Sequence, residues 1–238
     1  MGKIAYKTYL NDRLKQVDFH GTPTFPLYIQ ITYERKSIFF KSYYFQLLSK
    51  RKYLIVVPGI GSRGPSLEFV KSREEVVIDY CIDKLGINFS LDTFKELYDG
   101  MSTDLCDMLE GGFFEYLFNF FWDEGNPSMR DAIHNAISTV NPYDLLHDFK
   151  RMFKADFYNK LIENSFYYAP PYLPLYGFKD GPQKGDPIIF SVMDWQDSSI
   201  KEKFQIYVEN TYPFAKANDV VKAVDTWAGK YLSVSDGE

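Results

Sequence analysis

Three groups of side chains have types and spacings that could support chemistry, and the first is a set of glycines. Gly59, Gly61 and Gly64 form a G-x-G-x-x-G motif. In dinucleotide-binding loops this spacing lets backbone N–H groups approach a pyrophosphate. The motif follows an apolar run at residues 53–57, but Pro65 comes directly after it and no regular βαβ succession continues. We therefore favour a connector between domains, with a phosphate-binding loop as the alternative.

The second group is acidic. Its members are Asp186, Asp194, Asp197 and Glu202. Carboxylates on either side of a strand can hold Mg²⁺ for phosphodiester chemistry. No lysine has the spacing of a nuclease partner, and Lys201 and Lys203 belong to an ordinary charged turn. A solvated loop is therefore the favoured interpretation.

The third group consists of His134 and His147, together with Cys106. Imidazole and thiolate groups are zinc ligands, but these three are spread over several predicted helices. Only a coincidence of the fold would bring them together, so we expect packed or surface histidines. The sequence thus predicts no catalytic residue, no metal site and no cofactor.

Charge divides the chain into a basic head and an acidic body. The first 53 residues carry ten Lys/Arg and three Asp/Glu, while the other 185 carry seventeen basic and twenty-nine acidic side chains. The overall net charge of -5 therefore conceals a head of +7 and a body of -12. Such asymmetry favours a polyanion as the partner of the head, and protein or solvent as the partner of the body.

The basic head has the pattern of a small antiparallel sheet. Residues 4–9 alternate as a strand, and residues 11–26 form a mostly polar segment with Gly and Pro breakers. Residues 27–33 alternate strictly, with Leu27, Ile29 and Ile31 on one face. A polar turn at residues 34–36 and a return strand at residues 37–45 complete a predicted three-stranded meander.

The polar face of this sheet, its turn and the basic run that follows suit nucleic acid. Lys and Arg neutralise phosphates, Gln and Thr can bond to base edges, and a narrow β-ribbon fits the major groove. The candidate DNA-binding residues are Gln30, Thr32, Arg35, Lys36, Lys41, Lys50, Arg51 and Lys52. The alternative is that these charges only keep the sheet soluble and block pairing at its edges.

The segment TFPLYIQITYERKSIFFKSYYF, residues 24–45, resembles the arm-type DNA-binding domain of phage-integrase tyrosine recombinases from mobile elements. The shared order is a first strand, a Gly/Pro-containing loop, a PLYIRIT-like strand, a basic turn and a third strand. The resemblance covers about the first 50 residues. It implies that the sheet lies in a groove of double-stranded DNA. Arg35 and Lys36 in the turn, with Gln30, Thr32 and Lys41 on the exposed face, would then be the DNA-facing positions.

The rest of the chain departs from that family. Its catalytic domain needs clustered Arg and His side chains, including a His-x-x-Arg motif, and a tyrosine nucleophile near the C-terminus. No His-x-x-Arg follows residue 53. The late tyrosines Tyr207, Tyr212 and Tyr231 have no phosphate-clamping set beside them. We therefore expect DNA binding without strand cleavage.

The acidic body has the pattern of helices. Helices are predicted at residues 66–85, 90–100, 103–121, 127–140, 141–164 and 215–232. Residues 166–187 are rich in Pro, Tyr and Gly and are predicted to be irregular. Residues 187–193 are predicted to form a buried strand. The predicted class is α+β. A β-rich domain at residues 1–57 is joined by a Gly/Pro connector at residues 58–65 to a helical domain at residues 66–238.

Two aromatic segments of the body, residues 112–122 and 167–176, are candidate surfaces for a protein partner or for self-association. The alternative is that both belong to the core. No run of eighteen apolar residues and no signal-peptide pattern is present, so we expect no membrane contact. Cys81 and Cys106 lack CxxC spacing, which favours reduced thiols and a cytoplasmic location.

These patterns together favour a non-catalytic DNA-binding accessory protein of a bacterial mobile element, with a body that docks a partner. One alternative is a protein-binding scaffold without DNA contact, and another is an enzyme acting on nucleotides or nucleic acid. The basic residues discriminate between the first two hypotheses. DNA binding requires Arg35, Lys36 and Lys41 to be exposed on one face, whereas a scaffold would pair them with carboxylates of the body.

Overall fold

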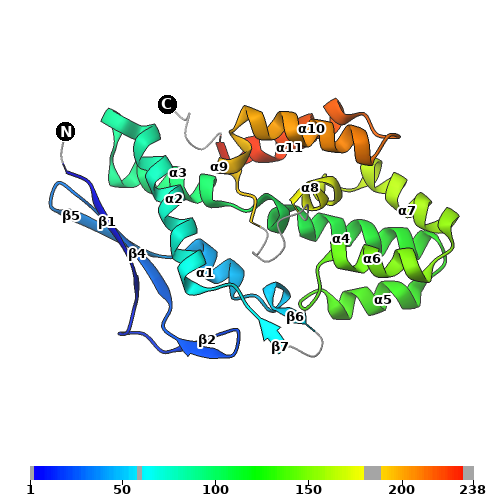
Figure 1. Ribbon diagram of the computed structural model, residues 1–238, viewed down its shortest axis with the longest axis horizontal. Coiled ribbons are helices and arrows are strands. Elements are labelled where there is room, and N and C mark those ends of the chain that lie inside the picture. Colours follow the sequence, from blue (N-terminus) through cyan, green and yellow to red (C-terminus); the bar gives the residue numbers. More distant parts are fainter. Residues whose placement is uncertain (1–2, 58–60, 180–188, 233–238) are drawn as a thin grey trace. The chain divides into compact units, whose positions relative to one another are not determined.

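A three-stranded antiparallel sheet in the order β1-β4-β5 opens the chain (Figure 1). The computed structural model describes residues 3–57, 61–179 and 189–232. The strands of the sheet are β1 (Ala5–Leu10), β4 (Leu27–Tyr33) and β5 (Lys36–Lys41). With the helices that follow, the sheet confirms the predicted α+β class.

The predicted alternation of β4 is confirmed. Leu27, Ile29 and Ile31 are buried on one face of the sheet, and the Tyr33 ring meets the Phe89 ring edge-on at 5.0 Å between centroids. Burial of this face fixes the register of the sheet, because a slip by one residue would expose these apolar side chains to solvent.

A hairpin separates β1 from β4, where the sequence predicted only a polar segment. It consists of β2 (Val17–Phe19) and β3 (Thr22–Thr24), joined by a turn in which His20 and Gly21 have positive φ angles of 55° and 84°. The Phe19 ring stacks on Phe45 at 5.0 Å, so one apolar side chain ties the hairpin to the core.

The predicted return strand at residues 37–45 is wrong in its second half. β5 ends at Lys41, and α1 (Tyr43–Leu48) begins directly after Ser42. The Ser42 hydroxyl accepts a hydrogen bond from the Phe45 N–H at 2.9 Å and caps the helix. The basic run then enters a single 3-10 turn, η1 (Arg51–Tyr53).

The glycine motif lies at a second hairpin. β6 (Ile55–Val57) pairs with β7 (Gly61–Arg63), while Gly59 lies outside the described residues. A Cβ at position 64 would fall 2.5 Å from the His20 ring, so close packing requires the glycine there. The described part of the motif is therefore a strand end and a packing site, and it does not form a loop that opens directly into a helix.

Helices α2 (Leu67–Leu85) and α3 (Leu91–Ser102), joined by η2 (Gly86–Asn88), cover the packed face of the sheet (Figure 1). Ser66 caps α2, and Ser90 forms a capping box with Thr93 at the start of α3. Both predicted helices are confirmed. The sheet, its hairpins and these helices form the first compact unit, residues 1–103 with 231–238, and residues 104–230 form the second unit.

The second unit is helical. Its helices are α4 (Leu105–Asp123), α5 (Pro127–Ala136), α6 (Pro142–Met152), α7 (Ala155–Tyr168), α8 (Tyr172–Lys179), α9 (Val192–Trp195), α10 (Ser198–Thr211) and α11 (Ala217–Leu232). α4 contacts α5, α6, α7 and α8 and supplies the largest share of the buried rings. No helix among the described residues is long and apolar enough to cross a membrane.

Three predictions for this unit need correction. The helix predicted at residues 141–164 is two helices, because Phe153 and Lys154 are both extended. The segment predicted to be irregular contains α8, in which Pro174 lies in the first turn, where its missing N–H has no intrahelical acceptor. Of the strand predicted at residues 187–193, the described part, residues 189–193, has one isolated bridge, Asp104 to Ser191, and then enters α9.

Candidate nucleic-acid interface

The face of the sheet opposite α2 and α3 gathers nine side chains by strand register. They are Ala5, Lys7 and Tyr9 on β1, Tyr28, Gln30 and Thr32 on β4, and Ser37, Phe39 and Lys41 on β5. We call this set the open face. The opposite side is identified by α2, whose Asp79 accepts a hydrogen bond from the Tyr6 hydroxyl at 2.8 Å. None of the nine is acidic.

The two lysines of the open face lie on its outer strands. Lys7 on β1 and Lys41 on β5 are both exposed. Within the described ranges, neither forms an ion pair with a carboxylate. Two positive charges that flank a surface without acidic residues create a local positive potential, which attracts a polyanion.

Three aromatic rings share this face. Tyr9 and Tyr28 lie opposite each other, with ring centroids 6.4 Å apart, and the Lys7 ammonium lies 5.0 Å from the centroid of the Tyr9 ring. Phe39 is 58% exposed, although its neighbours Ile38 and Phe40 turn toward the packed face. Sequence reasoning missed Lys7, Tyr9 and Phe39.

The polar residues of the open face bond to one another. The hydroxyls of Thr32 and Ser37 share a hydrogen bond of 2.8 Å, and the Gln30 amide nitrogen lies 3.4 Å from each of them. A shallow hollow of about 190 Å³ lies beside this group, with Lys7, Gln30 and Thr32 in its lining. The predicted site residues Gln30, Thr32 and Lys41 are therefore brought together on one face.

The basic turn is exposed but does not share that face, so the prediction that Arg35, Lys36 and Lys41 lie on one face is wrong. Glu34 and Arg35 have positive φ angles of 48° and 65°, as in the two-residue turns that match the twist of a hairpin. Lys36 pairs with Tyr33, so its register places it on the packed side. It lies five positions before Lys41 along β5, a distance of about 17 Å.

The second basic run also lies away from the open face. Lys50, Arg51 and Lys52 follow α1, which packs against α2 on the helical side of the sheet. The Lys52 ammonium lies 5.3 Å from the centroid of the Tyr53 ring. These residues can extend a positive surface around the edge of the unit, but they are not part of the open face.

A buried carboxylate holds the junction between β5 and α1. Glu74 of α2 accepts hydrogen bonds from the hydroxyls of Ser42 and Tyr98 and from the Tyr44 N–H, the last at 3.0 Å. Burial raises the pKa of Glu74, and these hydrogen bonds oppose the shift. Glu74 thereby fixes the point where the chain leaves the open face at Lys41.

The acidic group predicted as a possible metal site has structural roles. Asp194 forms a capping box with Ser191 at the start of α9, and Asp197 caps α10. The hydrogen bonds from Ser199 lower the pKa of Asp197. Glu202 is exposed within α10, where the sequence predicted a turn, and Asp186 lies outside the described residues.

The histidines and the cysteine of the third group are not brought together as a metal site. His134 packs against the Phe118 ring at 5.7 Å, a ring nitrogen of His147 lies 3.2 Å from the Tyr143 carbonyl, and Cys106 is buried in α4. Across residues 3–57, 61–179 and 189–232, no three His, Cys, Asp or Glu side chains are grouped as metal ligands would be.

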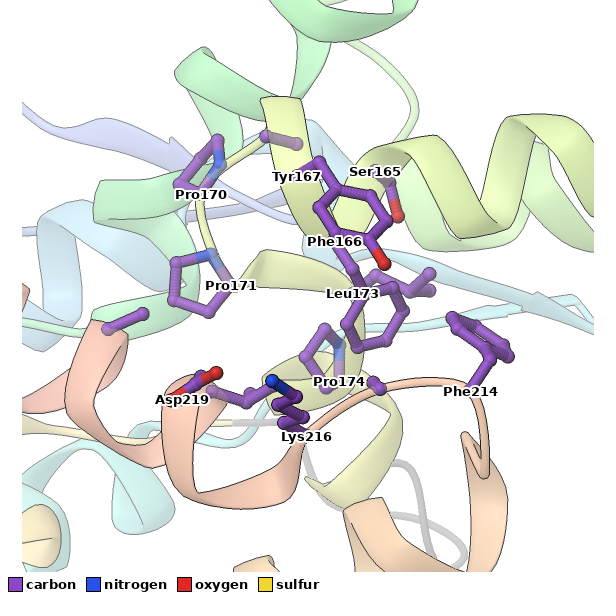
Figure 2. A pocket seen from close by; sticks show the side chains of 14 residues that line it. Ser165, Phe166, Tyr167, Pro170, Pro171, Leu173, Pro174, Phe214, Lys216 and Asp219 are labelled. Atoms are coloured by element: carbon purple, nitrogen blue, oxygen red, sulfur yellow. The ribbon is translucent and has the colours of Figure 1, made fainter.

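A groove of about 310 Å³ in the second unit is lined mainly by apolar side chains, with Lys216 and Asp219 also in its lining (Figure 2). The rings of Tyr167 and Phe214 and the prolines Pro170, Pro171 and Pro174 lie around it. It overlaps the candidate partner surface at residues 167–176, and residues 165–166 and 214–223 supply the rest of its lining. The other candidate, residues 112–122, is mainly core, and its one large ring that is strongly exposed is Trp122 at 59%.

Comparison with known proteins supplies no family for this chain. A scan against family models, a search of curated proteins and a search of solved structures each found no match. The resemblance of residues 24–45 to an arm-type domain therefore stays a prediction. The function must be argued from the chemistry of the surfaces described above.

Proposed function

We propose that this chain is a non-catalytic DNA-binding protein and that its first unit binds DNA through the open face. One observation carries the proposal. The nine side chains of the open face include three aromatic rings, no carboxylate and two lysines that form no ion pair with any carboxylate of the described residues. In the whole chain, by contrast, 32 acidic side chains outnumber 27 basic ones.

The net charges of the two units also favour the first unit as the part that binds DNA. The first unit has fifteen Lys/Arg and thirteen Asp/Glu, a net +2, and the second has twelve and nineteen, a net -7. Phosphate contacts supply most of the affinity of non-specific DNA binding. A polyanion is therefore attracted to the first unit and repelled by the second.

The exposed turn residues Arg35 and Lys36 and the run from Lys50 to Lys52 have a secondary role in this proposal. They lie off the open face, so they can contact only phosphates at its periphery. We expect them to strengthen binding without reading sequence, since phosphate contacts carry no sequence information.

The second unit, in this proposal, docks a protein partner at the proline-lined groove. Exposed rings beside prolines give contact area at a low cost in conformational entropy, and Tyr167 is 75% exposed there. A bacterial mobile element and a cytoplasmic location are the setting that the arm-domain resemblance and the cysteine usage favour. No catalytic step belongs to the proposal, because the sequence after residue 53 lacks the His-x-x-Arg motif that the recombinase family needs.

Fluorescence anisotropy with labelled DNA tests the proposal. The variant Lys7→Ala/Lys41→Ala removes both lysines of the open face, and Lys71→Ala/Lys84→Ala on α2 is the control with the same change in net charge. We expect the first variant to lose about tenfold in affinity at low salt, because two phosphate contacts disappear. Equal losses in both variants, or no binding by the unmodified protein, would overturn the proposal.

A further inference from the structure

Phe39 is placed as a platform for a flat ligand. It lies in the middle row of the open face, in register with Gln30 and Lys7, and more than half of its surface is exposed. The charges around it match a phosphate chain rather than an apolar protein surface, because both charged side chains of the open face are lysines. An exposed ring between cations is the arrangement in which bases stack while phosphates are neutralised.

Tyr9 and Tyr28 extend this platform along the strands. Their row is adjacent to that of Phe39, and adjacent rows on one face lie about 7 Å apart. The hollow lined by Lys7, Gln30 and Thr32 adjoins the row of Phe39 on the side away from the tyrosines. Successive bases of an extended strand can therefore meet successive positions on the open face.

The polar group of the open face is poorly placed to read a duplex. Gln30, Thr32 and Ser37 are engaged with one another, so reaching base edges in a groove would break these hydrogen bonds. Duplex DNA also hides the faces of its bases, which leaves a ring such as Phe39 without a stacking partner. Unpaired bases present their faces and need no change in the polar group.

We infer that the open face binds single-stranded DNA in preference to duplex, with bases stacked on Phe39 and the tyrosines and phosphates held by Lys7 and Lys41. The inference rests on the proposed DNA binding and deepens it. It also departs from the duplex that the arm-domain resemblance implies, so duplex preference is an outcome of the test.

The test compares a labelled oligothymidylate with a blunt duplex of equal length. Phe39→Ala and Phe39→Leu should each weaken binding of the single strand about tenfold, because both remove the stacking surface. Phe39→Trp should retain binding, since it keeps an aromatic face. Ile87→Ala, which removes a strongly exposed apolar side chain of the same unit, is the control and should bind as the unmodified protein does.

Different results separate the inference from the proposed function. If Phe39→Leu binds the single strand as tightly as the unmodified protein, or if the unmodified protein prefers duplex, the inference is wrong while DNA binding stands. If neither form of DNA binds at low salt, both fall. Thermal unfolding of each variant shows whether its fold is kept, and Phe39→Leu preserves apolar bulk at the position.

Discussion

At the scale of single residues, two buried carboxylates each link separate segments within one unit. Glu74 binds three donors from two other segments of the first unit, and Asp104 has the same part in the second. The sequence did not single out either residue, because an isolated Glu or Asp within a helical pattern normally indicates a solvated position. Only the fold shows that each one gathers backbone or hydroxyl donors.

The raised pKa of Glu74 makes a prediction about pH. Because the folded-state pKa lies above the ordinary value of 4.5, stabilisation by the protonated carboxyl is fully present below that value. It is lost as the pH rises through the raised pKa. Glu74→Gln keeps the shape without a titrating group, so the stability of the unmodified protein relative to this variant should fall above pH 4.5. Urea unfolding over a pH series measures this difference, and a difference that stays constant with pH would contradict it.

Asp104 gives a second prediction. Its carboxylate accepts from the Asp107 N–H at 2.7 Å and from the Phe190 N–H at 2.6 Å. Burial raises its pKa, and the charge of Lys179 opposes that shift. In Asp104→Asn an NH₂ group must face one of the two N–H donors, which should cost about 2 kcal/mol of unfolding free energy. The exposed change Asp131→Asn in α5 is the matched control, and equal stability of the two variants would rule out this role.

At the scale of elements, the two residues of the turn between β4 and β5 adopt a backbone conformation that is unfavourable for their residue types. Glu34 and Arg35 both have positive φ angles, which a residue with a Cβ adopts at a cost. Asn-Gly is the preferred pair for such turns. The change Glu34→Asn/Arg35→Gly should therefore stabilise the protein by about 1 kcal/mol, measured by chemical unfolding. Destabilisation would show that the side chains of the turn matter more than its backbone.

The sequence predicted well those elements that are determined by residues within or next to the element itself. The alternation at residues 27–33 was sufficient for β4, and Ser66 and Ser90 marked the starts of α2 and α3. The error at residues 37–45 has a distant cause. Its aromatic residues favour a strand, but Ser42 and the carboxylate of Glu74, 32 residues away, stabilise the start of α1 instead.

The candidate site was predictable only in part for a similar reason. Gln30, Thr32 and Lys41 follow from the alternation of β4 and β5 alone. Lys7 and Tyr9 required the register between β1 and β4, which depends on how the intervening hairpin folds. In the sequence, Phe39 is one apolar residue among several. Only the register of β5, which turns Ile38 and Phe40 to the packed face, shows that Phe39 is exposed.

At the scale of the whole molecule, the charge asymmetry seen in the sequence persists in the folded units, although the units do not divide where the composition changes. α2 and α3 carry acidic residues into the first unit and lower its net charge to +2. The positive potential of that unit therefore depends on where its lysines lie. Two of these lysines, Lys7 and Lys41, lie on the open face, whose nine side chains include no carboxylate.

The salt dependence of DNA binding is the most direct test of this account. For the unmodified protein, the logarithm of the binding constant should fall linearly with the logarithm of salt concentration. Removing Lys7 and Lys41 together should reduce that slope by about 1.4 for a single strand, because each lost phosphate contact contributes about 0.7. The control Lys71→Ala/Lys84→Ala should leave the slope unchanged. An unchanged slope in the open-face variant, or no binding at low salt, would contradict the claim that this face holds DNA.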